Sequence, residues 1–209
     1  MDDEICTLEE LRAIYRRPGG GAVQKEHGSI NLGDRAFIAH APFVVISTAD
    51  ADGRCDASPK GGPPGFVSVL DDGRVAIPDL SGNNRLDTMQ NVLDNARVAL
   101  LFLVPGLEET LRVNGRASLS TDIEVRTACA IGDAVPKVAI VVDPEEVYIH
   151  CGKALRRSGL WQQEQWPSLD DMPTPAEMLR DEVAPDMEIA AIQEALESDY
   201  AKTLWQAPQ

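Results

Sequence analysis

Short apolar runs separated by turn-forming residues dominate the chain between positions 43 and 150. Residues 43–48 are β-branched and apolar on both faces of an extended chain, which is typical of a buried strand. The Asp52-Gly53 pair that follows predicts a tight hairpin, because Asp-Gly supplies the positive φ angles that such a turn requires. Further runs occupy residues 55–60, 66–70, 74–80, 98–104, 110–119, 138–142 and 146–150. We expect six or seven antiparallel strands from these runs, a density that suits a small barrel rather than βαβ units.

The run that begins at Thr110 alternates strictly between apolar and polar positions. Leu111 and Val113 therefore lie on one face of the predicted strand, and Arg112 and Asn114 lie on the other. An arginine in the middle of a strand is expected to point either into a barrel or across an interface.

Three segments before Trp161 have sequence patterns that predict a helix. Thr7 and Glu10 form a capping box that predicts a helix to about residue 16, and a connection is expected over residues 23–35. A helix is also expected over residues 84–95, and another around Glu124. In residues 84–95 one apolar stripe supports the helix, formed by Leu86, Met89, Val92 and Leu93.

The composition changes after Trp161, where a segment rich in proline and aspartate leads to a second capping box at Thr174. The helices expected there are too small for a core of their own, so they should pack on the barrel or on a partner subunit. The chain thus divides into an N-terminal helix and connection (1–35), a β-barrel (36–161) and an acidic helical tail (162–209).

The charge of the chain excludes some functions. Its 209 residues include 19 basic and 34 acidic ones, a formal net charge of −15, which argues against a nucleic-acid partner. No apolar stretch approaches the roughly 20 residues that span a membrane. The acidic start of the chain is unlike a secretory signal, and the four cysteines are scattered. We expect a soluble cytoplasmic protein with reduced thiols.

Familiar catalytic motifs are absent from the sequence, including a dinucleotide fingerprint, a P-loop and a G-x-S-x-G elbow. The three histidines have none of the common zinc spacings, so no metal site is expected. His150 and Cys151 are adjacent on a predicted strand and point to opposite faces, which favours a strand-end histidine beside a buried thiol over a nucleophile pair.

Cationic side chains gather where the chain changes direction. Asn84 and Arg85 open a predicted helix, whose first amides are unpaired and whose dipole is positive, so together they form a phosphate-sized anion site. Lys60 ends a strand, and Lys153 lies in a basic segment that reaches Trp161. In an acidic protein this arrangement indicates a bound anion. The alternative is that each cation is a surface residue that pairs with a nearby acid.

Several separated segments resemble one family. They are the runs FVVIST (43–48), DASPKG (56–61), PDLSGNNRLDT (78–88), ETLRVNGRA (109–117) and HCGKA (150–154). Together, over about residues 34–161, they are similar to a bacterial branch of the pyridoxamine 5′-phosphate oxidase-like, FMN-binding split β-barrel family. The resemblance implies a mainly β split barrel with peripheral helices, and a homodimer that binds FMN in a cleft between its two barrels.

The resemblance also implies roles for particular residues. Ser58 and Lys60 would lie along the flavin and its phosphate tail. Thr110 and Arg112 would lie near the flavin ring. The residues at the helix start would hold the phosphate, and the second subunit would contribute three further residues to the site. The residues of the helix start are Asn84, Arg85 and Thr88, and those of the second subunit are Lys153, Ser158 and Trp161.

The sequence departs from the oxidases in two respects. Asn83-Asn84-Arg85 replaces their Ser-Arg-Lys phosphate motif, and their C-terminal substrate pattern of arginine and histidine is not evident. The resemblance therefore implies FMN binding more strongly than pyridoxamine oxidation. The leading hypothesis is an FMN-dependent oxidoreductase of unknown substrate. The alternatives are a non-catalytic flavin-storage or sensor protein, an interaction module that acts through its tail helices, and a barrel that holds a deazaflavin or haem.

Overall fold

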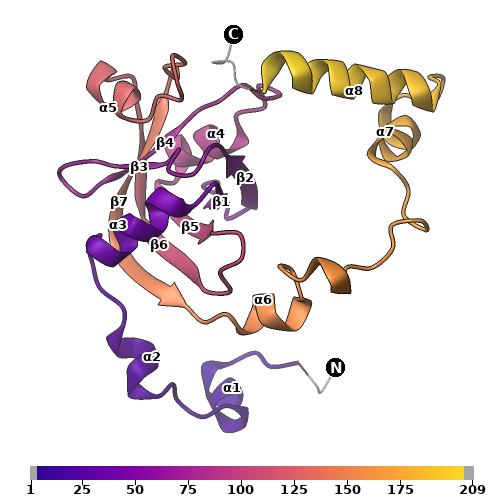
Figure 1. The fold of residues 1–209 in the computed structure, drawn as a ribbon. Helices are drawn as coiled ribbons and strands as arrows, with labels where there is room; N and C mark the ends of the chain where they lie inside the picture. Colours follow the sequence, from indigo (N-terminus) through magenta and orange to yellow (C-terminus); the bar gives the residue numbers. More distant parts are fainter. Residues whose placement is uncertain (1–3, 205–209) are drawn as a thin grey trace.

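The computed structural model describes residues 4–204, and its centre is a single antiparallel sheet (Figure 1). The sheet has seven strands in the order β2-β1-β5-β6-β7-β4-β3. The strands are β1 (Phe43–Ala49), β2 (Cys55–Gly61), β3 (Ser68–Val69), β4 (Val75–Pro78), β5 (Arg97–Leu103), β6 (Thr110–Ser120) and β7 (Ala139–His150). Because β2 and β3 remain as edges, the sheet is a split barrel, and the predicted fold is confirmed.

Helices surround this sheet and extend the chain at both ends. They are α1 (Leu8–Ile14), α2 (Gly20–Gln24), α3 (Leu32–His40), α4 (Asp87–Asp94), α5 (Ile123–Ala128), α6 (Lys153–Ser158), the 3-10 helix η1 (Gln163–Gln165), α7 (Pro175–Val183) and α8 (Ile189–Thr203). The capping boxes predicted at Thr7 and Thr174 are both present.

The inner face of the sheet forms the main core. Ile46, Phe102 and Val113 are fully buried there, and α3 and α4 cover them with Ile38 and Val92. On the opposite face a smaller cluster lies beneath α5, formed by Ala76, Cys129, Ala139 and Val141. Burial raises the pKa of the Cys129 thiol to about 11, so this cysteine is a structural residue.

The predicted strand boundaries need two corrections. Residues 138–142 and 146–150 belong to one strand, β7, which passes Pro144 at a register shift opposite Gly115. Residues 23–35 are more than a connection, since α3 begins within them. Its start is a capping box in which Asn31 accepts from the Gly33 and Asp34 amides.

The predicted pattern of burial is also corrected in three places. Cys151 is exposed and is not the buried thiol that the sequence predicts. The β1 strand is buried on one face only, because Phe43 is 38% exposed on the outer face. In α4 the buried side chains are Thr88, Met89 and Val92, whereas Leu86 and Leu93 are exposed. The apolar stripe of α4 that packs on the core is therefore shorter than the sequence predicts.

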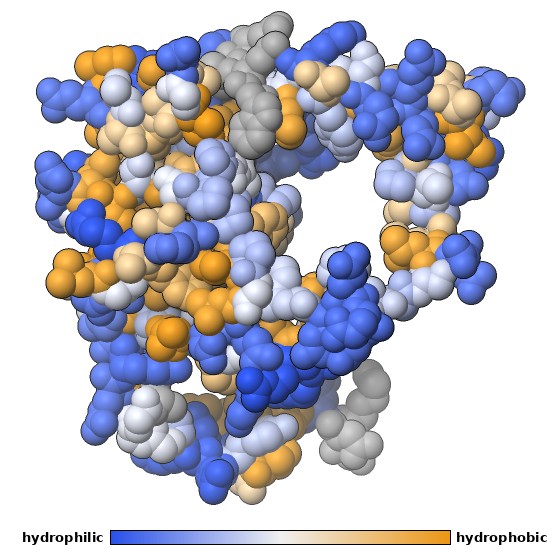
Figure 2. All heavy atoms as spheres, viewed as in Figure 1, coloured by the Kyte–Doolittle hydropathy of each residue, from blue (hydrophilic) through white to orange (hydrophobic). Residues whose placement is uncertain are grey.

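The acidic tail leaves the barrel after η1 and ends in two helices. Within one chain α7 and α8 pack chiefly on each other, where Ala176 and Ile192 are buried. Figure 2 shows these helices apart from the barrel over most of their length. Val183 and Tyr200 are among the apolar side chains that the tail exposes. The packing of the tail on a partner subunit stays a prediction.

Among residues 4–204, no helix combines the length and the hydrophobicity needed to cross a bilayer.

Candidate functional site

The helix α4 begins at Asp87, so Asn84 and Arg85 lie in the loop before it and do not open it as predicted. This loop is held in an unusual conformation. Leu86 is the N-cap of α4 in the left-handed region, with φ of 60°, and provides no side-chain cap. Asn84 is also left-handed, with φ of 57°. Asparagine tolerates this region, but a leucine there is strained. Strain of this kind is maintained by the surrounding structure and is concentrated at functional sites.

Hydrogen bonds fix the loop around Arg85 in this geometry. The Asn83 side chain accepts from the Arg85 amide at 3.0 Å, and Gln90 donates to the Arg85 carbonyl at 2.7 Å. The Arg85 guanidinium is exposed and donates to Asp87 at 2.8 Å, and this contact raises the pKa of Arg85. The first amides of α4 lack a cap, so an anion that displaces Asp87 would meet both the amides and the arginine.

Strand β2 brings a second set of predicted residues to this loop. Ser58 and Lys60 pair in register with the core residues Ile46 and Val44, so they lie on the inner face, towards α4. Burial raises the pKa of Asp79, and the positive charge of Lys60 opposes this increase. Lys60 therefore lies close to the segment that leads to α4.

The helix is anchored to the sheet at its middle. Thr88 is buried, and the Asn91 amide donates to the Thr48 hydroxyl at 2.9 Å. The Thr88 side chain is therefore inside the protein and not on the exposed loop. The hydrogen bond between Asn91 and Thr48 anchors the middle of α4 to β1.

The remaining predicted residues form a separate group around β6 and α6. The Trp161 indole donates to the Leu107 carbonyl at 2.8 Å, and Arg156 holds Glu108 at 2.7 Å. The Ser158 hydroxyl donates to Leu155 in its own helix, at 3.0 Å, and Lys153 is exposed at the start of α6. This group, with Thr110 and Arg112, faces away from the core.

The predicted residues thus fall into two groups on different faces of the sheet. Ser58, Lys60, Asn84, Arg85 and Thr88 lie at the inner edge, around α4. The other group lies on the outer face and at α6, and it comprises Thr110, Arg112, Lys153, Ser158 and Trp161. One chain does not bring the two groups into a single site, so a shared site requires a second chain.

The structure reveals a further cluster that the sequence did not indicate. Tyr148 lies opposite Arg112 in the β6–β7 register, and the Arg112 Nη1 atom donates to its hydroxyl at 3.2 Å. Lys25 Nζ lies 5.5 Å from the centre of the same ring. The His150 ring lies 6.3 Å from the Tyr148 ring. The alternation of residues 146–150 could have placed Tyr148 and His150 on one face, but not Lys25.

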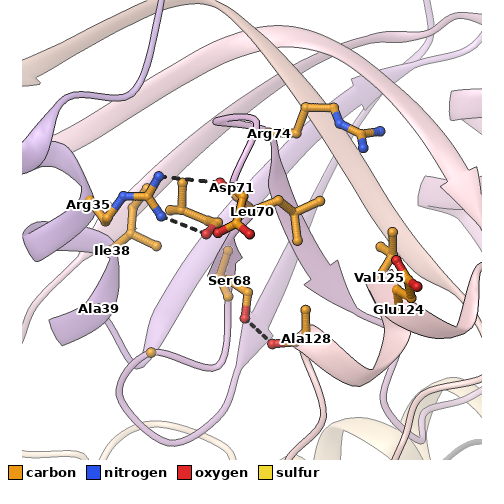
Figure 3. Close-up of a pocket in the computed structure, with 13 residues that line it drawn as sticks. Arg35, Ile38, Ala39, Ser68, Leu70, Asp71, Arg74, Glu124, Val125 and Ala128 are labelled. Atoms are coloured by element: carbon orange, nitrogen blue, oxygen red, sulfur yellow. Dashed lines mark hydrogen bonds between the residues drawn. The ribbon is translucent and has the colours of Figure 1, made fainter.

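A cavity lies elsewhere, between α3, the β3–β4 hairpin and α5 (Figure 3). Its volume is about 540 Å³, and none of the predicted site residues lines it. Arg35 donates to the Val69 and Leu70 carbonyls at 2.7 and 3.3 Å, and the Ser68 hydroxyl donates to Ala128 at 2.6 Å. These hydrogen bonds join the walls of the cavity.

A second hollow of about 440 Å³ lies beside the β1–β2 hairpin and the start of β5. Asp56, Ala57 and Cys55 line it from β2, with Arg97 from β5. Asp56 also raises the pKa of Arg85 through its charge. The charge of Asp56 therefore acts both in this hollow and on Arg85 of the inner group.

Comparison with known proteins supports one family. Residues 34–151 match the family described as pyridoxamine 5′-phosphate oxidase. No curated protein matches the chain.

Similar solved structures cover little more than half of this chain. HupZ from Group A Streptococcus is 19% identical, with a TM-score of 0.47, over 57% of this chain and 93% of its own. General Stress Protein 26 from Bacillus anthracis is 16% identical, with a TM-score of 0.42, over 55% and 88%. HutZ, a haem storage protein from Vibrio cholerae, is 11% identical, with a TM-score of 0.39, over 58% and 94%.

Proposed function

The chain belongs to the pyridoxamine 5′-phosphate oxidase family, and from this premise we propose that it is an FMN-dependent oxidoreductase that binds its cofactor as a homodimer. The observation that carries this proposal is the uncapped start of α4, where left-handed Leu86 and exposed Arg85 form an anion site. A phosphate fits this site because it can accept from the free amides and from the guanidinium together.

The inner group of residues would bind and orient the cofactor. Arg85, Asn84 and the amides of the first turn of α4 would hold the phosphate. Ser58 and Lys60 would follow the tail of the flavin along β2. FMN, when bound, supplies hydride or electron transfer, and the chain supplies position and charge. We nominate no acid–base residue of the chain for the reaction.

The outer face of the sheet supports the second copy of the chain in this proposal. One row of cross-strand neighbours on this face runs over β2, β1 and β5. It consists of three apolar side chains, those of Pro59, Val45 and Leu101. Phe43 and Leu103 form the neighbouring row. An apolar strip that adjoins the outer group of polar residues is a suitable contact for an identical barrel, and it would bring Lys153, Ser158 and Trp161 of one chain to the cofactor of the other.

This contact leads to a prediction for Phe43, which is 38% exposed on the outer face. Replacement of Phe43 with glutamate should convert the dimer to monomers, because a charge would be buried without a partner. Leu93→Glu is the matched control, since Leu93 is 74% exposed on the surface of α4. Light scattering after size exclusion gives the molar mass. A Phe43 variant that remains as dimeric as the Leu93 variant would remove this face from the interface.

The cofactor itself can be tested with the purified protein. We expect a yellow protein whose released ligand has the mass of FMN, and whose bound flavin is reduced by NADH or NADPH and reoxidised by oxygen. Reduction without any turnover would favour a flavin store or sensor. A colourless protein that gains no flavin absorbance on titration with FMN would contradict the proposal and favour an interaction module. A ligand with the mass of a deazaflavin or haem would identify another cofactor in the same fold.

A further inference from the structure

The cationic cluster around Tyr148 lacks the acidic partners that other cations of this protein have. Arg54, Arg74 and Arg97 each form an ion pair with an aspartate or glutamate. In the part of the chain that the structure describes, neither Lys25 nor Arg112 forms such a pair, although both are partly buried. Both cations lie instead over one aromatic ring, with Lys25 Nζ at 5.5 Å and Arg112 Cζ at 5.9 Å from the centre of Tyr148.

Two acids of this region are engaged elsewhere, and Glu109, next to Thr110, forms no ion pair with the cluster among residues 4–204. Glu146 accepts from the Asn114 side chain at 2.7 Å, and Glu108 is held by Arg156. The pKa of His150 is lowered by burial and by the positive charges of Arg112 and Lys25. The cluster therefore has an uncompensated positive potential, which repels a proton from the imidazole.

The donors of the cluster converge on one place. Thr110 and His150 face each other across β6 and β7, and Arg112 and Tyr148 occupy the next pair on the same face. Because the Tyr148 hydroxyl accepts from Arg112, its own proton remains available to a ligand. An ammonium, a guanidinium, a phenol and an imidazole are together the donors that an oxyanion accepts from.

We propose that Lys25, Arg112, Tyr148 and His150 form a binding site for the oxyanion group of a small molecule, on the outer face of β6 and β7. The site extends beyond the proposed function, which assigns no ligand to Lys25, Tyr148 or His150. It lies on the opposite face of the sheet from the α4 loop of the same chain, although the resemblance places Arg112 near the flavin ring of a dimer. An oxyanion there would satisfy the unpaired cations and would favour protonation of His150.

The proposal is tested by histidine NMR, with inorganic sulfate as the probe. Sulfate keeps its charge across the titration range of histidine, so any change reports on the protein. We expect sulfate to raise the pKa of His150, relative to sodium chloride at the same ionic strength. His40, on α3 at the inner side of the sheet, is the internal control and should not change. His150→Gln assigns the signal. Equal changes at both histidines would overturn the proposal.

Two arginine variants locate the site. Arg112→Gln should weaken sulfate binding about tenfold, the scale of one lost charged hydrogen bond. Arg116→Gln is the matched control, since Arg116 lies on the same face of β6 opposite Asp143, and it should bind as the wild type does. Equal losses of sulfate affinity in both variants would mean that sulfate responds to the general positive charge of this face and not to a defined site. That result would overturn the proposal.

A final experiment, with FMN present, distinguishes this site from the cofactor cleft. With FMN bound, sulfate should still raise the pKa of His150. If FMN abolishes the sulfate effect, the cluster belongs to the flavin site and the proposal of an independent site is wrong. Because FMN binding is measured separately by absorbance, failure of the sulfate test leaves the proposed function intact, and the reverse also holds.

Discussion

Replacement of Gly115 with alanine should lower the free energy of unfolding by about 2–3 kcal/mol, the range for overpacking a close-packed interior. A Cβ atom on Gly115 would overlap the carbonyl oxygen of Asp143 on the adjacent strand, and it would lie 3.2 Å from the Pro144 Cα. Both atoms belong to the backbone, so they cannot move aside as a flexible side chain does. The contact lies at the register shift between β6 and β7, so relief of the overlap would separate these strands.

The measurement is urea unfolding, with the m-value as a check that the two-state transition is preserved. Gly82→Ala is the matched control, because a Cβ on Gly82 has no neighbour within 4 Å and its φ is not in the left-handed region. It should change the free energy of unfolding by less than about 0.5 kcal/mol. If both variants unfold at the same urea concentration, the close approach of β6 and β7 is wrong.

Pro144, which faces this glycine, explains why the sequence predicts two strands where the structure has the single strand β7. Pro144 has no amide hydrogen and normally ends or interrupts a central strand, so a break near it was the reasonable expectation. The structure accommodates it by pairing Pro144 with Gly115 at a register shift. Only the partner strand, which is distant in sequence, makes a continuous β7 possible.

Local signals predicted the elements whose conformation is set by neighbouring residues. The β1–β2 hairpin is one example, because Asp52-Gly53 determines its turn, and Gly53 has φ of 81°. The start of α3 was missed because its capping box uses Asn31 and Asp34, a weaker signal than a threonine with a glutamate, and because few apolar side chains follow it. Ile38 is buried by the barrel core, a tertiary effect that the segment itself does not show.

The same distinction applies to the candidate sites. The loop that opens α4 and its exposed arginine were predictable, because these residues are consecutive in sequence, and the anion site there stays a prediction. The Tyr148 cluster was not predictable, because Arg112 and Tyr148 meet only through the register of two strands. Lys25 reaches the same ring from the N-terminal segment, where His27 forms a bridge to Val147. The relation between the two groups of predicted residues depends on a second chain, which one sequence cannot position.

The second large effect is expected at Arg85, in the binding of FMN. Arg85→Ala should weaken FMN binding about ten- to a hundredfold, the scale of a hydrogen bond to a charged group. Arg85→Lys should give an intermediate loss, because lysine keeps the charge but not the planar fork that binds phosphate through two hydrogen bonds. The dissociation constant is measured by the quenching of flavin fluorescence.

Riboflavin, which lacks the phosphate, distinguishes a phosphate contact from general damage to the site. The loss on Arg85→Ala should be large for FMN and negligible for riboflavin, since the proposed contact of Arg85 is with the phosphate alone. Arg54→Ala is the matched control, because Arg54 is 78% exposed against 72% for Arg85 and likewise pairs with a nearby aspartate. An equal loss for both flavins would mean that Arg85 supports the loop and not the phosphate. Unchanged FMN affinity would place the phosphate away from α4.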